Sequence, residues 1–156
     1  MDRLEEIGLL LRAATRESDR RLNDLLREVG ITASQAEALQ LLDRWGPMSL
    51  RELGGLLVAE GGHPSRLVDR MVSAGLVARR PAEHDRRQVE LVATAHGRAL
   101  VERVRERKGI YRAWLEGQLA GMDLPSVRAF FEAYLAGTPL GETVRLRREK
   151  GTLADG

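Results

Sequence analysis

The spacing of hydrophobic residues predicts six helices in this chain. Within each stretch apolar side chains recur every three or four positions, so that they share one face of a helix. Glycine, proline and small polar residues, which favour helix ends, separate the stretches. The predicted helices cover residues 3–29, 33–45, 50–57, 64–74, 95–122 and 124–136.

The third and fourth helices are predicted to form a helix-turn-helix unit. Ser49 and Glu52 have the spacing of a capping box, in which each side chain accepts a hydrogen bond from the other residue's backbone N–H. Pro64 suits the first position of the fourth helix, and Gly75 suits the position just after its end. Residues placed at about 100° intervals around this helix divide into an apolar face and a polar face. The polar face comprises Ser65, Arg66, Asp69, Arg70 and Ser73.

A β-hairpin is predicted to follow this unit. Polar and apolar residues alternate around Val89 and Leu91, which is the period of a strand with one buried face. We expect strands at 76–80 and 87–92, and a one-residue strand at Met48 that completes the sheet. Helix, turn, helix and basic hairpin make a winged helix-turn-helix, a mainly α fold whose second helix enters the major groove of DNA.

Five short segments of this region occur in an order that is typical of one protein family. They are RLVDRM at 66–71, GLV at 75–77, RR at 79–80, DRR at 85–87 and TAHGR at 94–98. Together they resemble the winged-helix core of the multiple-antibiotic-resistance regulator (MarR) family, whose hairpin carries an Asp-x-Arg motif. The resemblance extends over nearly the whole chain and implies a transcription regulator. The turn at 58–64 departs from the family pattern, since it is slightly longer and has an extra glycine.

Positive charge is concentrated where the chain is predicted to contact DNA. Residues 63–108 carry 11 basic and 6 acidic side chains, whereas residues 1–43 carry 6 and 9. The remaining segments are balanced, so the net charge of +2 hides this asymmetry. A surface that binds a polyanion requires such a distribution. A genome rich in arginine codons would explain the arginine content but not its uneven placement.

The fourth helix supplies the first candidates for a DNA interface. Arg66 and Arg70 lie on its polar face, and arginine binds O6 and N7 of guanine together or grips a phosphate. A solvated face with an Arg–Asp pair is the alternative for either residue. Ser65 lies near the helix N-terminus, where free backbone N–H groups favour a phosphate, and His63 lies just ahead of it.

The hairpin supplies the remaining candidates. Arg86 and Arg87 are expected to reach a narrow minor groove, where the negative potential is strongest. Arg79 and Arg80 at the base are expected to contact phosphates. The resemblance implies that Asp85 holds Arg87 in position and does not itself touch DNA.

Both ends of the chain are candidates for a dimer interface. The long first helix has more apolar surface than it can bury by itself, and the helices after the hairpin carry most of the large aromatic side chains. We therefore expect one domain over residues 1–137, with dimerisation helices at 3–29 and 95–137 around a winged helix-turn-helix at 32–94. Residues 138–156 are basic and poor in apolar side chains, which predicts a flexible tail.

Composition argues against several other functions. The 156 residues include no cysteine, which excludes disulfides, thiolate metal sites and thiol redox sensing. His63, His84 and His96 have no partners at metal-ligand spacing, and neither a catalytic constellation nor a phosphate loop is present. We therefore expect no metal, no cofactor and no enzyme activity. Because neither a membrane-spanning apolar run nor a signal peptide is found, we expect a cytoplasmic protein.

These patterns predict a sequence-specific DNA-binding transcription regulator that acts as a homodimer on a pseudo-palindromic operator. The resemblance implies a repressor that responds to a small aromatic or phenolic ligand, bound where the dimerisation helices meet the DNA-binding lobe. An architectural DNA-binding protein without sequence preference is one alternative, and a winged helix that binds other proteins is the second. Arg66 and Arg70 argue against the second, which an acidic or apolar outer face would favour.

Overall fold

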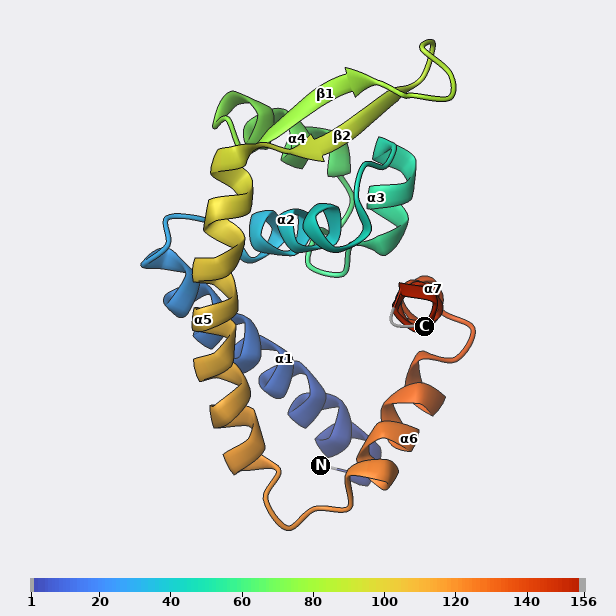
Figure 1. The fold of residues 1–156 in the computed structure, drawn as a ribbon. Coiled ribbons are helices and arrows are strands. Elements are labelled where there is room, and N and C mark those ends of the chain that lie inside the picture. Colours follow the sequence, from blue (N-terminus) through green and yellow to red (C-terminus); the bar gives the residue numbers. More distant parts are fainter. Residues whose placement is uncertain (1, 155–156) are drawn as a thin grey trace.

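The computed structural model describes residues 2–154 and is mostly helical (Figure 1). The six predicted helices and both strands are present, although several ends differ by a few residues from those predicted. A further helix follows them. The elements are α1 (Arg3–Arg27), α2 (Ala33–Trp45), α3 (Leu50–Leu56), α4 (Pro64–Ser73), β1 (Val77–Pro81), β2 (Val89–Ala93), α5 (Ala95–Gln118), α6 (Leu124–Leu135) and α7 (Pro139–Ala154).

The winged helix-turn-helix lobe is built from α2, α3, α4 and the hairpin, which lies across the top of the lobe in Figure 1. Strands β1 and β2 pair antiparallel, with Val77 opposite Ala93. Met48 forms the predicted one-residue strand, since it makes a bridge with Leu91. Apolar side chains from all these elements form the core. Leu39, Leu53, Leu67, Val68, Met71, Val77 and Leu91 are among its fully buried members.

Local capping explains where α2 and α3 begin. The predicted capping box of α3 is confirmed: Ser49 N–H donates to Glu52 Oε2 at 2.8 Å, and Glu52 N–H donates to Ser49 Oγ at 3.2 Å. Thr32 is the N-cap of α2, and it forms a second capping box with Gln35. Each pair satisfies backbone N–H groups that have no partner inside the helix.

A close contact fixes α5 against the start of the hairpin. Thr94, the N-cap of α5, donates through Oγ1 to the carbonyl of Gly75 at 2.6 Å and accepts from the N–H of Gly97 at 3.0 Å. A Cβ atom at position 97 would lie 2.2 Å from the carbonyl oxygen of Leu76. Only glycine allows this approach, so Gly97 helps to set the angle at which α5 leaves the winged helix.

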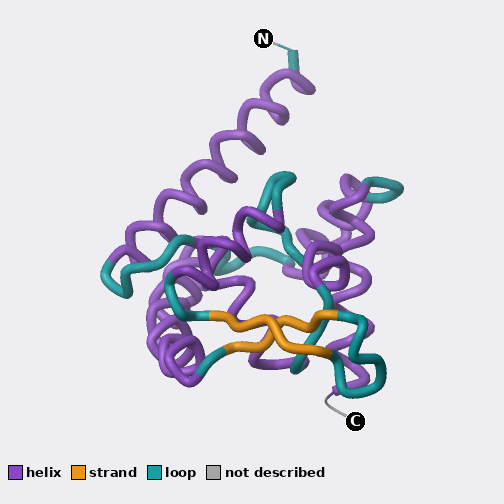
Figure 2. The backbone as a smooth tube through the Cα atoms, turned by 90° about the horizontal axis from the view of Figure 1, so that it is seen from above, coloured by secondary structure: helices purple, strands orange, loops and turns teal. Residues whose placement is uncertain are grey.

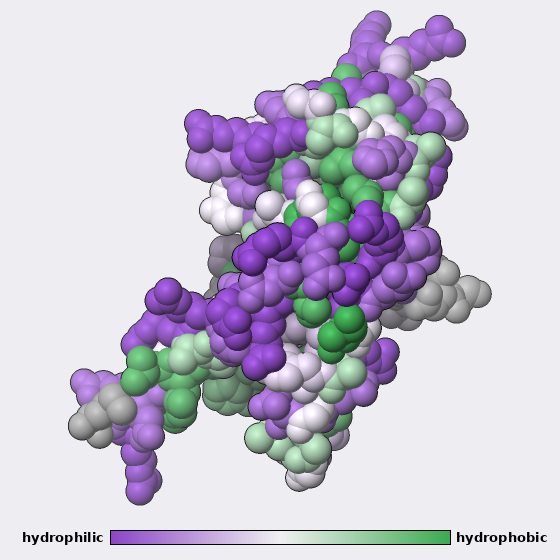
Figure 3. All heavy atoms as spheres, turned by 90° about the vertical axis from the view of Figure 1, so that its left-hand side faces the viewer, coloured by the Kyte–Doolittle hydropathy of each residue, from purple (hydrophilic) through white to green (hydrophobic). Residues whose placement is uncertain are grey.

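Helices α1 and α5 extend away from the lobe, and α1 is seen reaching outward to the N-terminus in Figure 2. An ion pair and a cation–π contact join them: Arg107 lies 2.7 Å from Glu28, the C-cap residue of α1, and the guanidinium of Arg21 lies 4.4 Å from the ring centre of Trp114. The ends of these helices and α6 leave large apolar side chains exposed, and apolar residues gather beside the N-terminus at the lower left of Figure 3. They include Leu4, Ile7, Leu9, Leu10, Ile110, Met122, Phe130, Phe131 and Tyr134.

Residues 139–154 form α7, so the prediction of a flexible tail is wrong for this segment. Thr138 Oγ1 accepts from the N–H of Gly141 at 3.0 Å at the start of the helix. The helix returns to the winged helix-turn-helix lobe, where Thr143 is buried and Leu146 packs against the core. Few of its side chains are apolar, and a sequence pattern alone does not reveal a helix that is stabilised by tertiary contacts in this way.

Candidate nucleic-acid interface

Helix α4 presents its predicted polar face to solvent. Leu67, Val68 and Met71 hold the opposite face in the core, each with no exposed surface. The exposed side chains are Ser65, Arg66, Asp69, Arg70 and Ser73. The division of the helix derived from its sequence is therefore confirmed, and its outer face is open to a partner.

Arg66 and Arg70 form no ion pair within residues 2–154. The alternative derived from the sequence was a pair with Asp69. That carboxylate instead lies 2.6 Å from Nη2 of Arg79, on strand β1. Both guanidinium groups on the outer face of α4 keep all their donors available, while Asp69 joins this helix to the hairpin.

The N-terminal end of α4 is open. His63 occupies the N-cap position and is exposed, but its side chain makes no capping bond. Gly62 ahead of it has φ +147°, which L side chains rarely adopt, so the extra glycine of this turn has a conformational role. The uncapped N–H groups, with Pro64 and exposed Ser65 in the first turn, leave a partial positive charge that favours an anion such as phosphate.

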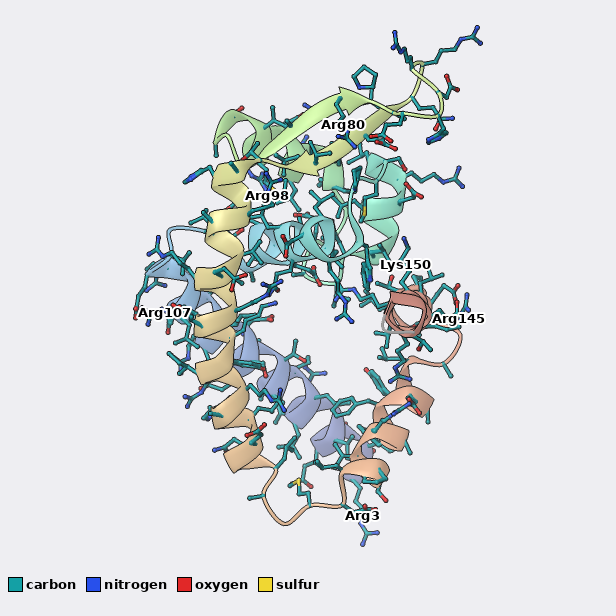
Figure 4. The ribbon with its side chains drawn as sticks, viewed as in Figure 1. Arg3, Arg80, Arg98, Arg107, Arg145 and Lys150 are labelled. Atoms are coloured by element: carbon teal, nitrogen blue, oxygen red, sulfur yellow. The ribbon has the colours of Figure 1, made fainter. Side chains whose placement is uncertain are left out.

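A tight turn shapes the tip of the hairpin. Asp85 Oδ1 accepts from the backbone N–H of Arg87 at 3.0 Å, and the carbonyl of Asp85 accepts from the N–H of Gln88 at 2.9 Å. The carboxylate thus acts on Arg87 through the backbone and not through its guanidinium. The side chains of Arg86 and Arg87 are exposed and unpaired within the described part of the chain. In Figure 4 the side chains of this loop extend outward beyond the sheet.

The arginines at the base of the hairpin are held differently from those at its tip. Arg80, labelled in Figure 4, has Nη2 3.7 Å from Glu83 and Nε 3.7 Å from Glu90. Arg79 forms an ion pair with Asp69. Carboxylates therefore offset part of the positive charge at the base, and the free charge lies at the tip and on α4.

The three histidines lie apart from one another on the surface. His63, His84 and His96 are all exposed, and His84 lies 4.0 Å from Glu90. Within residues 2–154 no three His, Asp or Glu side chains are grouped so that they could hold a metal ion. No helix of the described chain is long and apolar enough to cross a membrane.

A cavity of about 750 Å³ lies below the winged helix, between α2, α5 and α7. Its lining is mainly basic, with Arg44, Arg105, Lys108, Arg147 and Arg148 set against Glu37 and Asp43.

Two residues that line this cavity carry buried polar groups. The indole Nε1 of Trp45 is buried without a hydrogen-bond partner. Burial lowers the pKa of Lys108, whose Nζ lies 2.5 Å from Oε1 of Gln40. The sequence could not join residues of α5 and α7 to Trp45, because those helices are distant from it in the chain.

The open, basic face of α4 next to an arginine-tipped hairpin defines a winged helix-turn-helix DNA-binding protein. Comparison with known proteins gives the family. Residues 31–89 match the model of the MarR family. The multiple antibiotic resistance protein MarR of Salmonella typhimurium is 31% identical over 103 residues, which cover 66% of this chain and 72% of that protein. The chain belongs to the MarR family, whose members are transcription regulators and not enzymes.

Solved structures agree with this assignment. A mutant of MarR from Escherichia coli, crystallised in complex with operator DNA, superposes with a TM-score of 0.75 at 28% identity. The match covers 86% of this chain and 99% of that one. The Bordetella bronchiseptica regulator BpsR, whose DNA binding is regulated by 6-hydroxynicotinic acid, also has a TM-score of 0.75, over 88% of this chain and 98% of its own. At 22% identity that likeness concerns the fold alone.

Proposed function

We propose that this chain is a repressor that binds a specific operator as a homodimer and releases it when a small aromatic acid binds. The observation that carries the proposal is the pair of unpaired arginines, Arg66 and Arg70, on the exposed face of α4. The operator complex of the Escherichia coli relative supports it, because 99% of that chain aligns with this fold. The protein would act in the cytoplasm, where bacterial DNA lies.

Each candidate residue receives a role in this proposal. Arg66 and Arg70 contact base edges or phosphates in the major groove, where a bidentate arginine distinguishes guanine from other bases. Arg86 and Arg87 enter the minor groove beside it. The remaining residues position the protein on the backbone or support these four. They are His63, Ser65, Arg79, Arg80 and Asp85.

The exposed apolar surfaces of α1 and α6 support a homodimer. Phe130 of α6 and Ile7 of α1 line a shallow apolar depression of about 220 Å³, and both side chains are more than two-fifths exposed in the single chain. Apolar surface of this extent is stabilised when a second copy covers it. Two copies related by a two-fold axis would present two α4 helices to successive major grooves, about 34–36 Å apart along DNA.

The cavity between α2, α5 and α7 is the proposed ligand site. Its basic lining suits a carboxylate, and Trp45 and Leu41 suit an aromatic ring. The ammonium of Lys108 can bind the carboxylate oxygens. The acid that regulates the Bordetella protein belongs to this chemical class.

Selection of bound sequences from a pool of random duplexes tests the proposal. We expect a single motif with two inverted half-sites, and a selected duplex should bind at least a thousandfold more tightly than a scrambled duplex of equal length and composition. The same titration with benzoate or 6-hydroxynicotinic acid should weaken binding of the selected duplex. Equal, salt-dependent affinity for both duplexes would instead identify an architectural protein. Failure to bind any duplex would favour the protein-interaction module.

A further inference from the structure

Three side chains hold the turn that leads from α3 into the recognition helix α4. Glu37 of α2 accepts from the backbone N–H of Val58 at 3.0 Å and from that of Ala59 at 2.7 Å, both through Oε2. Ser34 Oγ donates to the carbonyl of Ala59 at 2.9 Å. The third side chain belongs to Arg147 of α7, which lies more than 90 residues further along the chain. The first residues of the turn are therefore fixed from two sides.

Arg147 binds two different groups of the winged helix at once. Its Nε donates to the carbonyl of Leu56, the last residue of α3, at 2.6 Å. Its Nη2 donates to Oε1 of Glu37, whose other oxygen holds the turn. A guanidinium suits this position because the last carbonyls of a helix lack internal partners and carry partial negative charge. Only a planar fork with several donors serves both acceptors.

Burial makes these contacts stronger than ordinary surface pairs. The Glu37 side chain is 12% exposed and that of Arg147 is 28% exposed, whereas most ion pairs of the described chain involve side chains that are more than two-fifths exposed. Water competes less for such groups, and a charge-assisted hydrogen bond in that setting holds its geometry. The contact thus couples the position of α7 to the turn 57–63.

We infer that Glu37 and Arg147 are positioning residues for DNA recognition: together they tie α7 to the turn before α4 and so set the orientation of the recognition helix. This inference rests on the proposed function, which it deepens. Neither side chain needs to touch DNA. Helix α7 follows directly after α6, whose apolar side chains are exposed, so movement of α6 in a dimer would reach α4 through this tie.

The tie also borders the proposed ligand cavity, since Glu37 and Arg147 both line it. An acid bound beside Trp45 and Lys108 therefore competes with Glu37 for the guanidinium of Arg147. Loss of that partner loosens the hold of Glu37 on Val58 and Ala59, and the recognition helix loses its fixed orientation. Ligand binding and DNA release are then linked by one side chain exchanging its partner.

The test compares Arg147→Gln and Glu37→Gln with Arg145→Gln as a matched control. Arg145 lies on the outer side of α7 in Figure 4, and among residues 2–154 its ion pairs are with Glu142 and Glu149 of its own helix. Affinity is measured for a duplex selected from a random pool and for its scrambled counterpart, at several salt concentrations. Amide hydrogen exchange of Val58 and Ala59 is measured in the free protein.

We expect Arg147→Gln and Glu37→Gln each to bind the selected duplex about tenfold more weakly, equivalent to about 1.4 kcal/mol. Their affinity for the scrambled duplex should remain nearly unchanged. The salt dependence should keep its slope, because no phosphate contact is lost. Both amides should exchange faster, and the double variant should lose little more than either single one, since the residues act as a unit. Arg145→Gln should behave like the wild type.

Several outcomes would overturn the inference. These are an unchanged preference for the selected duplex in both variants, an equal loss on both duplexes, or the same loss in Arg145→Gln. Arg147→Gln leaves the side chain of Glu37 in place, so it serves as the second variant if Glu37→Gln unfolds. A wild type without preference for any duplex would defeat the proposed function itself. In that case the amide exchange of Val58 and Ala59 still shows whether Arg147 and Glu37 hold the turn. Failure of the inference can therefore be distinguished from failure of the proposed function.

Discussion

Arg79 of β1 and Asp69 of α4 join the wing to the recognition helix, with Nη2 of Arg79 2.6 Å from Oδ1 of Asp69. The two side chains are 42% and 64% exposed, so the pair contributes less than about 1 kcal/mol to stability. Its effect is on position and charge. Asp69 places a negative charge on the face of α4 proposed to meet DNA, and it offsets part of the positive charge of Arg79.

Replacing Asp69 by alanine should therefore strengthen non-specific DNA binding. The substitution removes a repulsive charge and frees Arg79, so the slope of log affinity against log salt should become steeper by about one unit on scrambled DNA. Preference for the selected duplex should fall, because the wing is no longer fixed to α4. Fluorescence anisotropy at several salt concentrations measures both effects. Weaker binding to both duplexes at unchanged slope would contradict this role for the pair.

The turn at the hairpin tip gives a second prediction. Arg87→Ala should weaken binding and reduce the salt slope by about one unit, since one contact in the phosphate region is lost. Asp85→Ala should also weaken binding, although it removes a negative charge, because the carboxylate that holds the N–H of Arg87 is gone. Tighter binding by Asp85→Ala would mean that charge alone decides and that the positioning role is wrong.

The outer face of α4 should determine specificity. If Arg66 or Arg70 contacts a guanine bidentately, its replacement by alanine should cost about 1–3 kcal/mol on the selected duplex and much less on the scrambled one. A phosphate contact would weaken binding to both equally. If neither variant changes the ratio of the two affinities, the specific contact must come from His63, Ser65 or the shape of the DNA.

The exposed ends of α1 and α6 should hold the dimer together. Leu10→Asp or Phe130→Asp places a charge in the apolar surface and should give a monomer in sedimentation equilibrium at concentrations where the wild type is a dimer. Deletion of residues 1–20 should do the same and abolish specific binding. Glu6→Gln, on an exposed position of the same helix, serves as the control. A deleted chain that remained dimeric and bound DNA normally would contradict this interface.

Lys108 should control the response to aromatic acids. Lys108→Gln should raise the concentration of benzoate needed to release DNA by about tenfold, because one charge-assisted hydrogen bond is lost. Arg112→Gln, on the same helix but paired with Glu116 outside the cavity, should respond normally. An unchanged response of Lys108→Gln would place the acid elsewhere.

The same lysine predicts a dependence of ligand binding on pH. Burial lowers the pKa of Lys108 below its ordinary 10.5, and a bound carboxylate favours the protonated form. The ligand therefore binds with proton uptake in the pH range between the lowered pKa and the pKa of the complex. Affinity for benzoate should fall as the pH rises through the lowered pKa, and isothermal calorimetry in buffers of different ionisation enthalpy measures the uptake.

The sequence by itself determined the features that depend on neighbours in the chain. The capping boxes, the start of α4 at Pro64 and the division of that helix into Leu67 on one side and Arg66 on the other all follow from residues a few positions apart. The contact between Asp85 and Arg87 is of the same kind, since its partners lie two positions apart in a turn. Such features are local because helix and turn geometry fixes which near neighbours meet.

Only the tertiary structure decided which distant side chains pair. Asp69 was free to pair along its own helix, and it meets Arg79 because the hairpin folds back over α4. Helix α7 has too few apolar residues to be recognised, yet it is stabilised where Arg147 meets Leu56 and Glu37. The angle at which elements dock decides these contacts and the cavity beside them, and that angle depends on the packing of the whole core rather than on any one segment.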